Sequence, residues 1–272
     1  MSMIDEEKMI KYLVLTLMKG IGPVTQNALL DMCGGIDRCF LMEAKELLAL
    51  DTNGKLKKSR INSFVSQRSD KELWSRAEGI LKEAYKKGIG IIVREDRDYP
   101  YRFDHISDMP IVLYVKGSLK INDHSLSVGI VGARRCTAEG KEKAIEQARS
   151  AVDNGAALIS GMAKGIDSYA HTAALKSHGY TVAVLGSGVD ICYPREHEKL
   201  YEEIAGSGCI LSEYPPGTQP REYYFPLRNR LIAALSDRLY VIEAGRHSGT
   251  VSTVESGEKY GREVKMELIC SS

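Results

Sequence analysis

The spacing of apolar residues in the first third of the chain predicts helices. Apolar side chains recur every three or four positions over residues 9–18, until the run Gly20-Ile21-Gly22-Pro23 interrupts the pattern. Pro23 suits the first turn of a second helix, which we expect to end at Gly34-Gly35. Residues 43–50 predict a third short helix, and residues 59–87 a mostly helical stretch. Residues 1–75 are therefore predicted to form a small all-helical domain.

After Gly88 the pattern changes to short, nearly continuous apolar runs rich in β-branched residues. Helical stretches separate most of the later runs, which cover residues 89–93, 111–115, 126–131, 157–160, 181–185, 209–211 and 239–242. Such runs are typical of strands buried on both faces, and their alternation with helices indicates βαβ units. We expect an α/β domain over residues 76–266, with a mainly parallel sheet that has helices on both faces. The stretch 95–108 is expected to be a long surface loop or an extension packed on the sheet.

Composition excludes several classes of protein. The chain is 43% hydrophobic and 27% charged, which is ordinary for a globular protein and excludes disorder. Its apolar runs are far shorter than the ~20 residues that span a bilayer, and its acidic start is unlike a secretory signal. We therefore expect a cytoplasmic protein with no membrane partner. The six cysteines are scattered without a CxxC pattern, so neither a disulfide framework nor a metal site is predicted.

The charges are balanced along the whole chain. Residues 1–75 carry 11 Lys and Arg against 10 Asp and Glu, and the remainder carries 26 of each sign. Neither part is a broadly basic binder of polyanions, so a nucleic-acid site would have to be a local pocket.

Glycine-rich segments follow three of the predicted strands. They cover residues 129–135, 160–167 and 185–190, and two of them contain a cation, Arg134 or Lys164. Ligands of doubly wound sheets bind at the carboxyl ends of the strands, where glycines let the backbone approach and helix N-termini offer N–H groups to anions. We therefore predict a phosphate-binding crevice, the alternative being glycines that only permit tight turns. Neither GxGxxG with a later acidic residue nor GxxxxGK[ST] is present, so a dinucleotide or nucleoside triphosphate is not favoured.

Two further segments extend the crevice. A proline-rich stretch over residues 212–220 leads into three aromatic residues at 223–225 and the run Arg228-Asn229-Arg230. Aromatic rings beside guanidinium groups suit stacked bases and phosphates, although the rings could equally anchor the loop in the core, which we favour for Phe225. Residues 243–250 form another turn rich in glycine, serine and threonine before a helix.

Six segments in fixed order resemble the DprA/Smf family of DNA-processing proteins. They read GIVGARR, SGMAKGIDSYAH, AVLGSGVDICYP, SEYPPGT, FPLRNRLIA and EAGRHSGT, and the resemblance runs from Ile106 to about Val264. It implies an extended Rossmann-like domain, preceded by a SAM-like or helix-hairpin-helix domain. It also implies a homodimer that binds single-stranded DNA and loads the RecA recombinase during natural transformation, with no cofactor and no catalytic residues.

The resemblance also implies which residues contact DNA. Arg134 and Lys164 would bind phosphates, and the other contacts would come from the glycine-rich loops and the rim of the crevice: Gly132, Ser160, Gly161, Gly165, Gly186, Gly188, Arg228, Asn229, Arg230, Ser248, Gly249 and Thr250. Asp167 is expected to brace the loop after Lys164, and His171 to be a satisfied core or surface histidine rather than a DNA ligand.

The two ends of the chain leave questions open. Family members usually continue after GREV into an apolar strand and often a winged-helix domain, whereas residues 267–272 are expected to be a short tail without that domain. Dimerisation is expected through the helix that begins near Thr250 and a strand near 262–266. The segment 20–23 resembles a hairpin that could contact a DNA phosphate, or it is a plain helix connection. The basic cluster within residues 55–60 is expected to be a solvated loop.

A second hypothesis is an enzyme. The lysine-decarboxylase-like phosphoribohydrolases share this Rossmann variant and use the glutamate of PGGxGTxxE for chemistry. The corresponding stretch here places Thr253 at that position, and Glu255 comes two residues too late and faces another side of a helix. A general acid or base is therefore missing, and we expect no enzyme. A scaffold with a vestigial pocket that acts only through protein partners is a third possibility.

Overall fold

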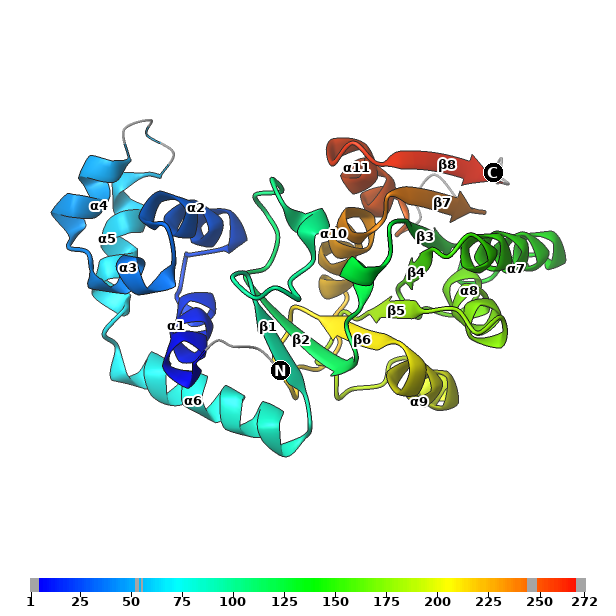
Figure 1. Cartoon of the computed structure of the whole chain (residues 1–272), viewed down its shortest axis with the longest axis horizontal. Coiled ribbons are helices and arrows are strands. Elements are labelled where there is room, and N and C mark those ends of the chain that lie inside the picture. Colours follow the sequence, from blue (N-terminus) through cyan, green and yellow to red (C-terminus); the bar gives the residue numbers. More distant parts are fainter. Residues whose placement is uncertain (1–4, 52–53, 55, 244–248, 268–272) are drawn as a thin grey trace. The chain divides into compact units, whose positions relative to one another are not determined.

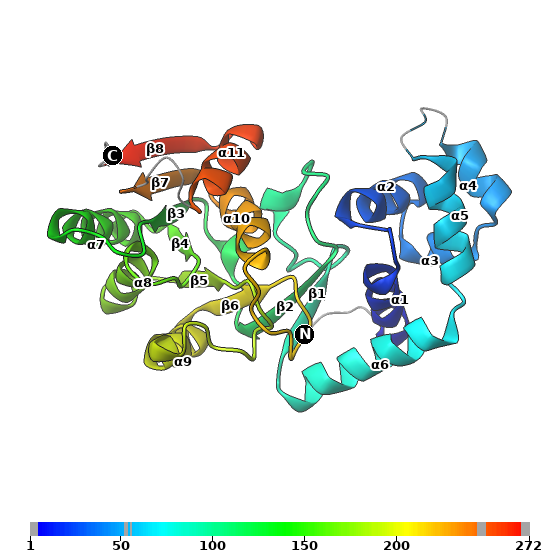
Figure 2. The ribbon, with the colours of Figure 1, turned by 180° about the vertical axis from the view of Figure 1, so that it is seen from behind.

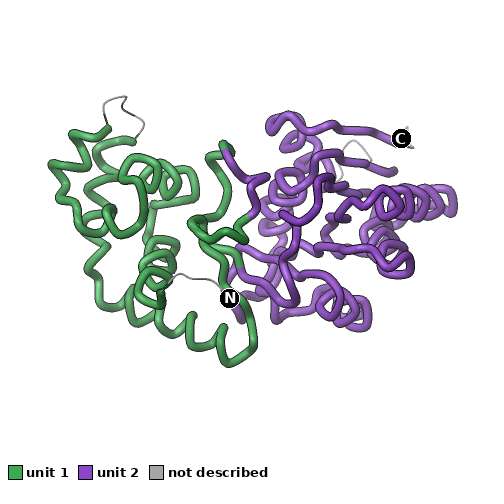
Figure 3. Tube along the Cα trace, viewed as in Figure 1, with its two compact units in different colours: residues 1–99, 105–113 green, residues 100–104, 114–272 purple. Residues whose placement is uncertain are grey.

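The structure is a computed structural model that describes residues 5–51, 54, 56–243 and 249–267. The chain divides into two compact units, which Figure 3 colours separately. Unit 1 comprises residues 1–99 and 105–113, and unit 2 comprises residues 100–104 and 114–272.

Helices make up most of unit 1. In chain order they are α1 (Glu6–Leu17), α2 (Pro23–Cys33), α3 (Ile36–Leu41), α4 (Ala44–Leu50), α5 (Lys58–Gln67) and α6 (Lys71–Lys86) (Figure 1). Gly34 ends α2 in the left-handed conformation, and its N–H donates to the carbonyl of Leu30, as the Gly-Gly pair predicts. The six-residue α3 was not predicted. The predicted boundary at residue 75 stays a prediction, and α6 runs through that position.

The strands form one sheet of the order β1-β2-β6-β5-β4-β3-β7-β8. Their bounds are β1 (Gly90–Val93), β2 (Val112–Gly117), β3 (Ser127–Gly132), β4 (Ala157–Ser160), β5 (Thr181–Val184), β6 (Cys209–Ser212), β7 (Arg238–Ile242) and β8 (Glu263–Glu267). Neighbours from β6 through β8 pair in parallel, whereas β2 pairs antiparallel with β6. The mainly parallel α/β fold is therefore confirmed.

Helices cover both faces of the parallel part of this sheet. α7 (Ala138–Asp153), α8 (Ile166–Lys176) and α9 (Glu198–Ser207) lie on one face, and α10 (Tyr224–Leu235) and α11 (Val251–Lys259) lie on the other (Figures 1 and 2). Strands β3 to β5 are almost wholly buried, which explains their continuous apolar sequences. Since the five strands β3 to β7 run in one direction, their carboxyl ends meet at one edge of the sheet, where the glycine-rich loops begin.

The segment 100–104 is anchored within unit 2 by a buried arginine. Arg102, in the short 3-10 helix η1 (Tyr101–Phe103), binds both carboxylate oxygens of Asp237 at 2.8–3.2 Å and donates to the carbonyls of Ile121 and His124. Asp237 also accepts hydrogen bonds from the backbone and hydroxyl of Ser127. This part of residues 95–108 is an extension that packs beside α10 and the start of β7.

None of the helices that the structure describes is long and apolar enough to cross a bilayer.

Candidate nucleic-acid interface

A hollow of about 560 Å³ opens at the carboxyl ends of the parallel strands. The end of β3, the loops after β3 and β4, and the first turns of α10 and α11 supply most of its wall. The lining residues are Val131, Gly132, Ala133, Arg134, Ala163, Asp167, Tyr193, Glu222, Phe225, Pro226, Arg228, Asn229, Gly249, Thr250 and Thr253. The loops that the sequence pointed to therefore surround one concave surface.

Two aromatic rings and two arginines face one another in this hollow. Tyr193 and Phe225 stack with their ring centres 5.5 Å apart. The guanidinium carbons of Arg134 and Arg228 lie 5.8 and 5.9 Å from the centre of the Phe225 ring, within cation–π range. A smaller hollow of about 70 Å³ shares these four residues and adds Gly161 and Lys164. The arrangement offers positive charge and apolar ring surface side by side.

Arg228 is the buried cation of the site, with only 5% of its surface exposed. Its guanidinium donates to the carbonyls of Gly161 (2.7 Å) and Val184, and its Nε donates to Oδ1 of Asn229 at 3.1 Å. Burial lowers the pKa of Arg228 to about 10, although the negative charge of Asp167 acts to raise it. The side chain therefore stays protonated at neutral pH and joins α10 to the loop after β4 and to the end of β5.

Asp167 braces the loop between β4 and α8, as predicted. Its carboxylate accepts hydrogen bonds from the backbone N–H groups of Gly161 (3.1 Å) and Ala163 (3.3 Å). Burial raises the pKa of this carboxyl, while the Arg228 charge acts in the opposite direction. The contacts fix the loop that carries Lys164.

Lys164 is exposed at the rim, where its Nζ lies 2.8 Å from a carboxylate oxygen of Glu196. Both side chains are about half exposed, so solvent can replace either partner. The next residue, Gly165, has φ +76° and caps the N-terminus of α8. A Cβ at Gly165 would lie 2.3 Å from the carbonyl oxygen of Ala133, so this close approach of two loops requires glycine.

Asn229 connects α10 to the start of α11. Its Nδ2 donates to the carbonyl of Gly249 at 2.8 Å and to the hydroxyl of Ser252 at 3.1 Å. Gly249 and Thr250 line the hollow, whereas Ser248 lies outside the residues that the structure describes. Thr253, at the position of the enzymes' glutamate, also lines the hollow, and its buried hydroxyl has no hydrogen-bond partner within the described part of the chain.

Besides Gly165, four of the residues predicted to contact DNA lie outside the walls of the two hollows. Ser160 is fully buried and its hydroxyl donates to the carbonyl of Ile130 at 2.5 Å. Gly186 lies against the Phe225 ring, and Gly188 against the backbone of residues 215–217. Arg230 forms a partly buried ion pair with Glu213. These positions support the walls, and their contact with DNA stays a prediction.

His171 is a core residue, as expected. It is fully buried in α8, and its Nδ1 lies 2.8 Å from the Thr181 hydroxyl. Burial lowers the pKa of this imidazole to about 3, so it is neutral at physiological pH.

The sequence predicted aromatic rings beside guanidinium groups at this site, but it did not identify which rings line the hollow. Tyr193 was not singled out, and Phe225, for which a core position was favoured, is half-buried and lines both hollows. Glu222 was also missed and adds a carboxylate to the wall. The sequence signal that could have marked Tyr193 is its position just before Pro194, in the segment that follows the glycine-rich end of β5.

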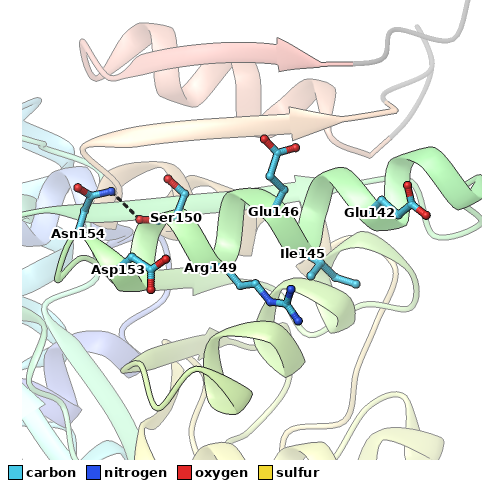
Figure 4. A pocket seen from close by; sticks show the side chains of 7 residues that line it. All are labelled: Glu142, Ile145, Glu146, Arg149, Ser150, Asp153 and Asn154. Atoms are coloured by element: carbon cyan, nitrogen blue, oxygen red, sulfur yellow. Dashed lines mark hydrogen bonds between the residues drawn. The ribbon is translucent and has the colours of Figure 1, made fainter.

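A second hollow, of about 570 Å³, runs along the outer side of α7 (Figure 4). All its lining residues come from α7 and its C-terminus: Glu142, Ile145, Glu146, Arg149, Ser150, Asp153 and Asn154. Three exposed carboxylates against one arginine make it unfavourable for a polyanion. The hollow at the strand ends is therefore the candidate site.

The fold and this site define an α/β protein with a crevice lined by arginines and aromatic rings at its strand ends, and the comparisons specify its family. Residues 90–267 match the family model of DNA recombination-mediator protein A. The chain is 40% identical over 169 residues to the DNA processing protein DprA of Streptococcus pneumoniae, covering 62% of this chain and 59% of that protein. It is 34% identical over 259 residues to protein Smf of Synechocystis, covering 93% of this chain and 63% of that protein.

Solved structures agree with the family match. The crystal structure of DprA from S. pneumoniae aligns with a TM-score of 0.74 at 30% identity, covering 97% of this chain and 87% of that one. A structure of DNA processing protein A from Helicobacter pylori, reported for its single-stranded DNA binding mode, aligns with a TM-score of 0.60 at 35% identity, covering 65% of this chain and 80% of that one. The chain belongs to the DprA/Smf family of DNA recombination mediators. It spans about 60% of the length of the S. pneumoniae and Synechocystis proteins.

Proposed function

We propose that this protein binds single-stranded DNA in the hollow at the strand ends and acts there as a recombination mediator. The observation that carries the proposal is the placement of the exposed Arg134 over the Phe225 ring, which stacks on Tyr193. Cations for phosphates together with aromatic faces for bases are the two elements of single-strand binding sites. With a net charge of only +1, affinity must come from this local site rather than from the field of the whole molecule.

Different residues have different parts in the proposal. The exposed Arg134 and Lys164 bind phosphates, and Gly132, Gly161 and Gly165 let the backbone come close to the strand. Arg228, Asn229, Gly249 and Thr250 form the wall at the starts of α10 and α11, and Ser248 would extend it. Ser160, Gly186, Gly188 and Arg230 contribute by holding these loops in place.

The wider role rests on family membership. We propose that the protein works as a homodimer, which loads RecA onto incoming single strands during natural transformation and catalyses no reaction. The edge strand β8 and helix α11 are the proposed dimer surfaces. Two hollows on one strand would raise the affinity through effective concentration, and static light scattering of the full chain tests the dimer.

Neutralising a phosphate-binding cation tests the site. We expect Arg134→Gln and Lys164→Gln each to weaken binding of oligo-dT by about 1–3 kcal/mol, the value of a hydrogen bond to a charged group. Each variant should also lower the slope of log affinity against log salt by about 0.7, which corresponds to one lost phosphate contact on a single strand. Fluorescence anisotropy titrations over a range of salt concentrations measure both quantities.

The matched control is Arg149→Gln, which removes an exposed arginine from the hollow on α7. It should leave both affinity and salt slope unchanged. The wild-type protein should bind a duplex much more weakly than its component strand, because a duplex does not fit the crevice. Equal effects of all three substitutions, or equal affinity for duplex and single strand, would argue against the site.

The ion pair between Lys164 and Glu196 predicts a gain of affinity. A DNA phosphate that binds Lys164 has to displace the Glu196 carboxylate, so Glu196→Gln should strengthen oligo-dT binding about 1.4- to fivefold, the range for an exposed ion pair. The control Glu146→Gln removes the same charge from the exposed face of α7. A comparable gain in both variants would show that only the total charge matters.

A further inference from the structure

Three tyrosines and one arginine form a cluster beside the hollow, which we call the tyrosine cluster: Tyr214, Arg221, Tyr223 and Tyr224. The rings of Tyr214 and Tyr224 lie with their centres 4.2 Å apart, and those of Tyr224 and Tyr223 lie 4.4 Å apart. Burial decreases along this row, from the half-buried Tyr214 and Tyr224 to Tyr223, which is 54% exposed. The inner rings therefore support an outer ring that faces solvent.

The outer ring is held in place by polar contacts as well. A guanidinium N–H of Arg221 donates to the Tyr223 hydroxyl at 3.1 Å. Hydrogen bonds with Tyr224 and Arg221 lower the pKa of the Tyr223 phenol. A ring that is already fixed loses little conformational freedom when a ligand stacks on it. Arg221 itself is exposed and keeps its charge in contact with water.

The chain path places this cluster next to the proposed DNA site. Glu222 and Phe225 line the hollow, and Tyr223 and Tyr224 are the two residues between them at the start of α10. The mouth of the hollow and the exposed ring are thus separated by one short segment. A strand that leaves the hollow between Glu222 and Phe225 would therefore run toward Tyr223.

We propose that Tyr223 and Arg221 form a second single-strand subsite outside the hollow, in which a base stacks on the tyrosine ring and the arginine binds the adjoining phosphate. The inference rests on the proposed function of the hollow and extends its footprint along the strand. A protein partner is the other possible occupant, but the cation beside the ring and the continuity with the hollow favour nucleic acid.

Length dependence of binding tests this subsite. Tyr223→Leu should weaken binding of long oligo-dT about tenfold, within the range for loss of one base–aromatic stack. It should not change the affinity for the shortest oligonucleotide that the protein binds. Tyr223→Phe keeps the ring and should retain most of the affinity for long strands. The control Tyr85→Leu removes a similarly exposed tyrosine, 57% accessible on α6. It should change neither the affinity for long oligo-dT nor the affinity for short oligo-dT.

Salt dependence separates the two residues of the subsite. Arg221→Gln should lower the salt slope for long strands by about 0.7, whereas Tyr223→Leu should leave the slope unchanged, because stacking releases no counterions. Circular dichroism and thermal unfolding confirm that each variant is folded.

The possible outcomes are distinct. If the wild-type protein does not bind single strands at all, the proposed function fails, and this inference fails with it. If the wild type binds but Tyr223→Leu binds every length equally well, only the second subsite is refuted. A loss that is the same for all lengths would show that Tyr223 merely supports the hollow. A changed molecular mass in light scattering with unchanged DNA binding would assign the surface to a second copy of the chain, and also overturn the inference.

Discussion

Gly165→Ala is expected to lower the free energy of unfolding by about 4 kcal/mol. The backbone there has φ +76° and ψ −127°, which an L-residue adopts at a cost of about 1–3 kcal/mol. The new Cβ would also lie 2.3 Å from the carbonyl oxygen of Ala133 and 2.7 Å from that of Arg134, so overpacking adds about 1–3 kcal/mol. Relief of this overlap would shift the loop that carries Arg134, so oligo-dT binding should fall as well. Urea denaturation followed by circular dichroism measures the stability.

Substitutions at two other glycines separate the cost of backbone strain from the cost of overpacking. Gly155 has φ +70° with no atom within 4 Å of its would-be Cβ, so Gly155→Ala should cost only the strain of about 1–2 kcal/mol. Gly206 lies within α9, also in open space, and Gly206→Ala should stabilise the protein by about 0.5–1 kcal/mol through helix propensity. Equal destabilisation by the substitutions at Gly165 and Gly155 would contradict the close approach of the two loops.

Arg228→Met should destabilise the fold by about 3–5 kcal/mol, the usual cost of removing one partner from a buried polar network. Methionine preserves the apolar stem, but the carbonyls of Gly161 and Val184 lose their donor and the buried Asp167 loses the positive charge that favours its ionised form. Urea denaturation again gives the free energy of unfolding. The control Arg135→Met changes an exposed arginine of the neighbouring loop and should stay within about 0.5 kcal/mol of the wild type. Similar stability of the two variants would show that Arg228 is not a structural cation.

Much of the fold could be predicted because it follows from local patterns. Buried parallel strands such as β3 to β5 have continuous apolar sequences, and α2 has a proline at its start and a glycine at its end. The antiparallel pairing of β2 with β6 could not be predicted, because register between distant segments is decided by tertiary packing. Helix α3 has only six residues, too few for a periodic signal.

The site was predictable at the level of loops but not of individual side chains. Glycines next to a cation at a strand end marked Arg134 and Lys164, which the structure places at the rims of the hollows. Arg228 and Arg230 belong to the same short motif, yet one is buried against two carbonyls and the other is paired with Glu213. Nothing local in the sequence distinguishes an exposed cation from a buried one, since burial depends on segments far away in the chain. For the same reason Tyr193 was overlooked.

The anchoring of Arg102 to Asp237 bears on how modular the molecule is. Residues 100–104 belong to unit 2, although the segments on both sides of them belong to unit 1, so the chain does not pass from one unit to the other at a single point. A fragment that starts after Leu113 keeps most of unit 2 but leaves Asp237 without the guanidinium that binds both its oxygens. Unit 2 therefore cannot be cut out of the chain as one continuous segment without including residues 105–113 of unit 1. A truncation in this region keeps residues 100–104 together with the rest of unit 2 only when it lies before Pro100.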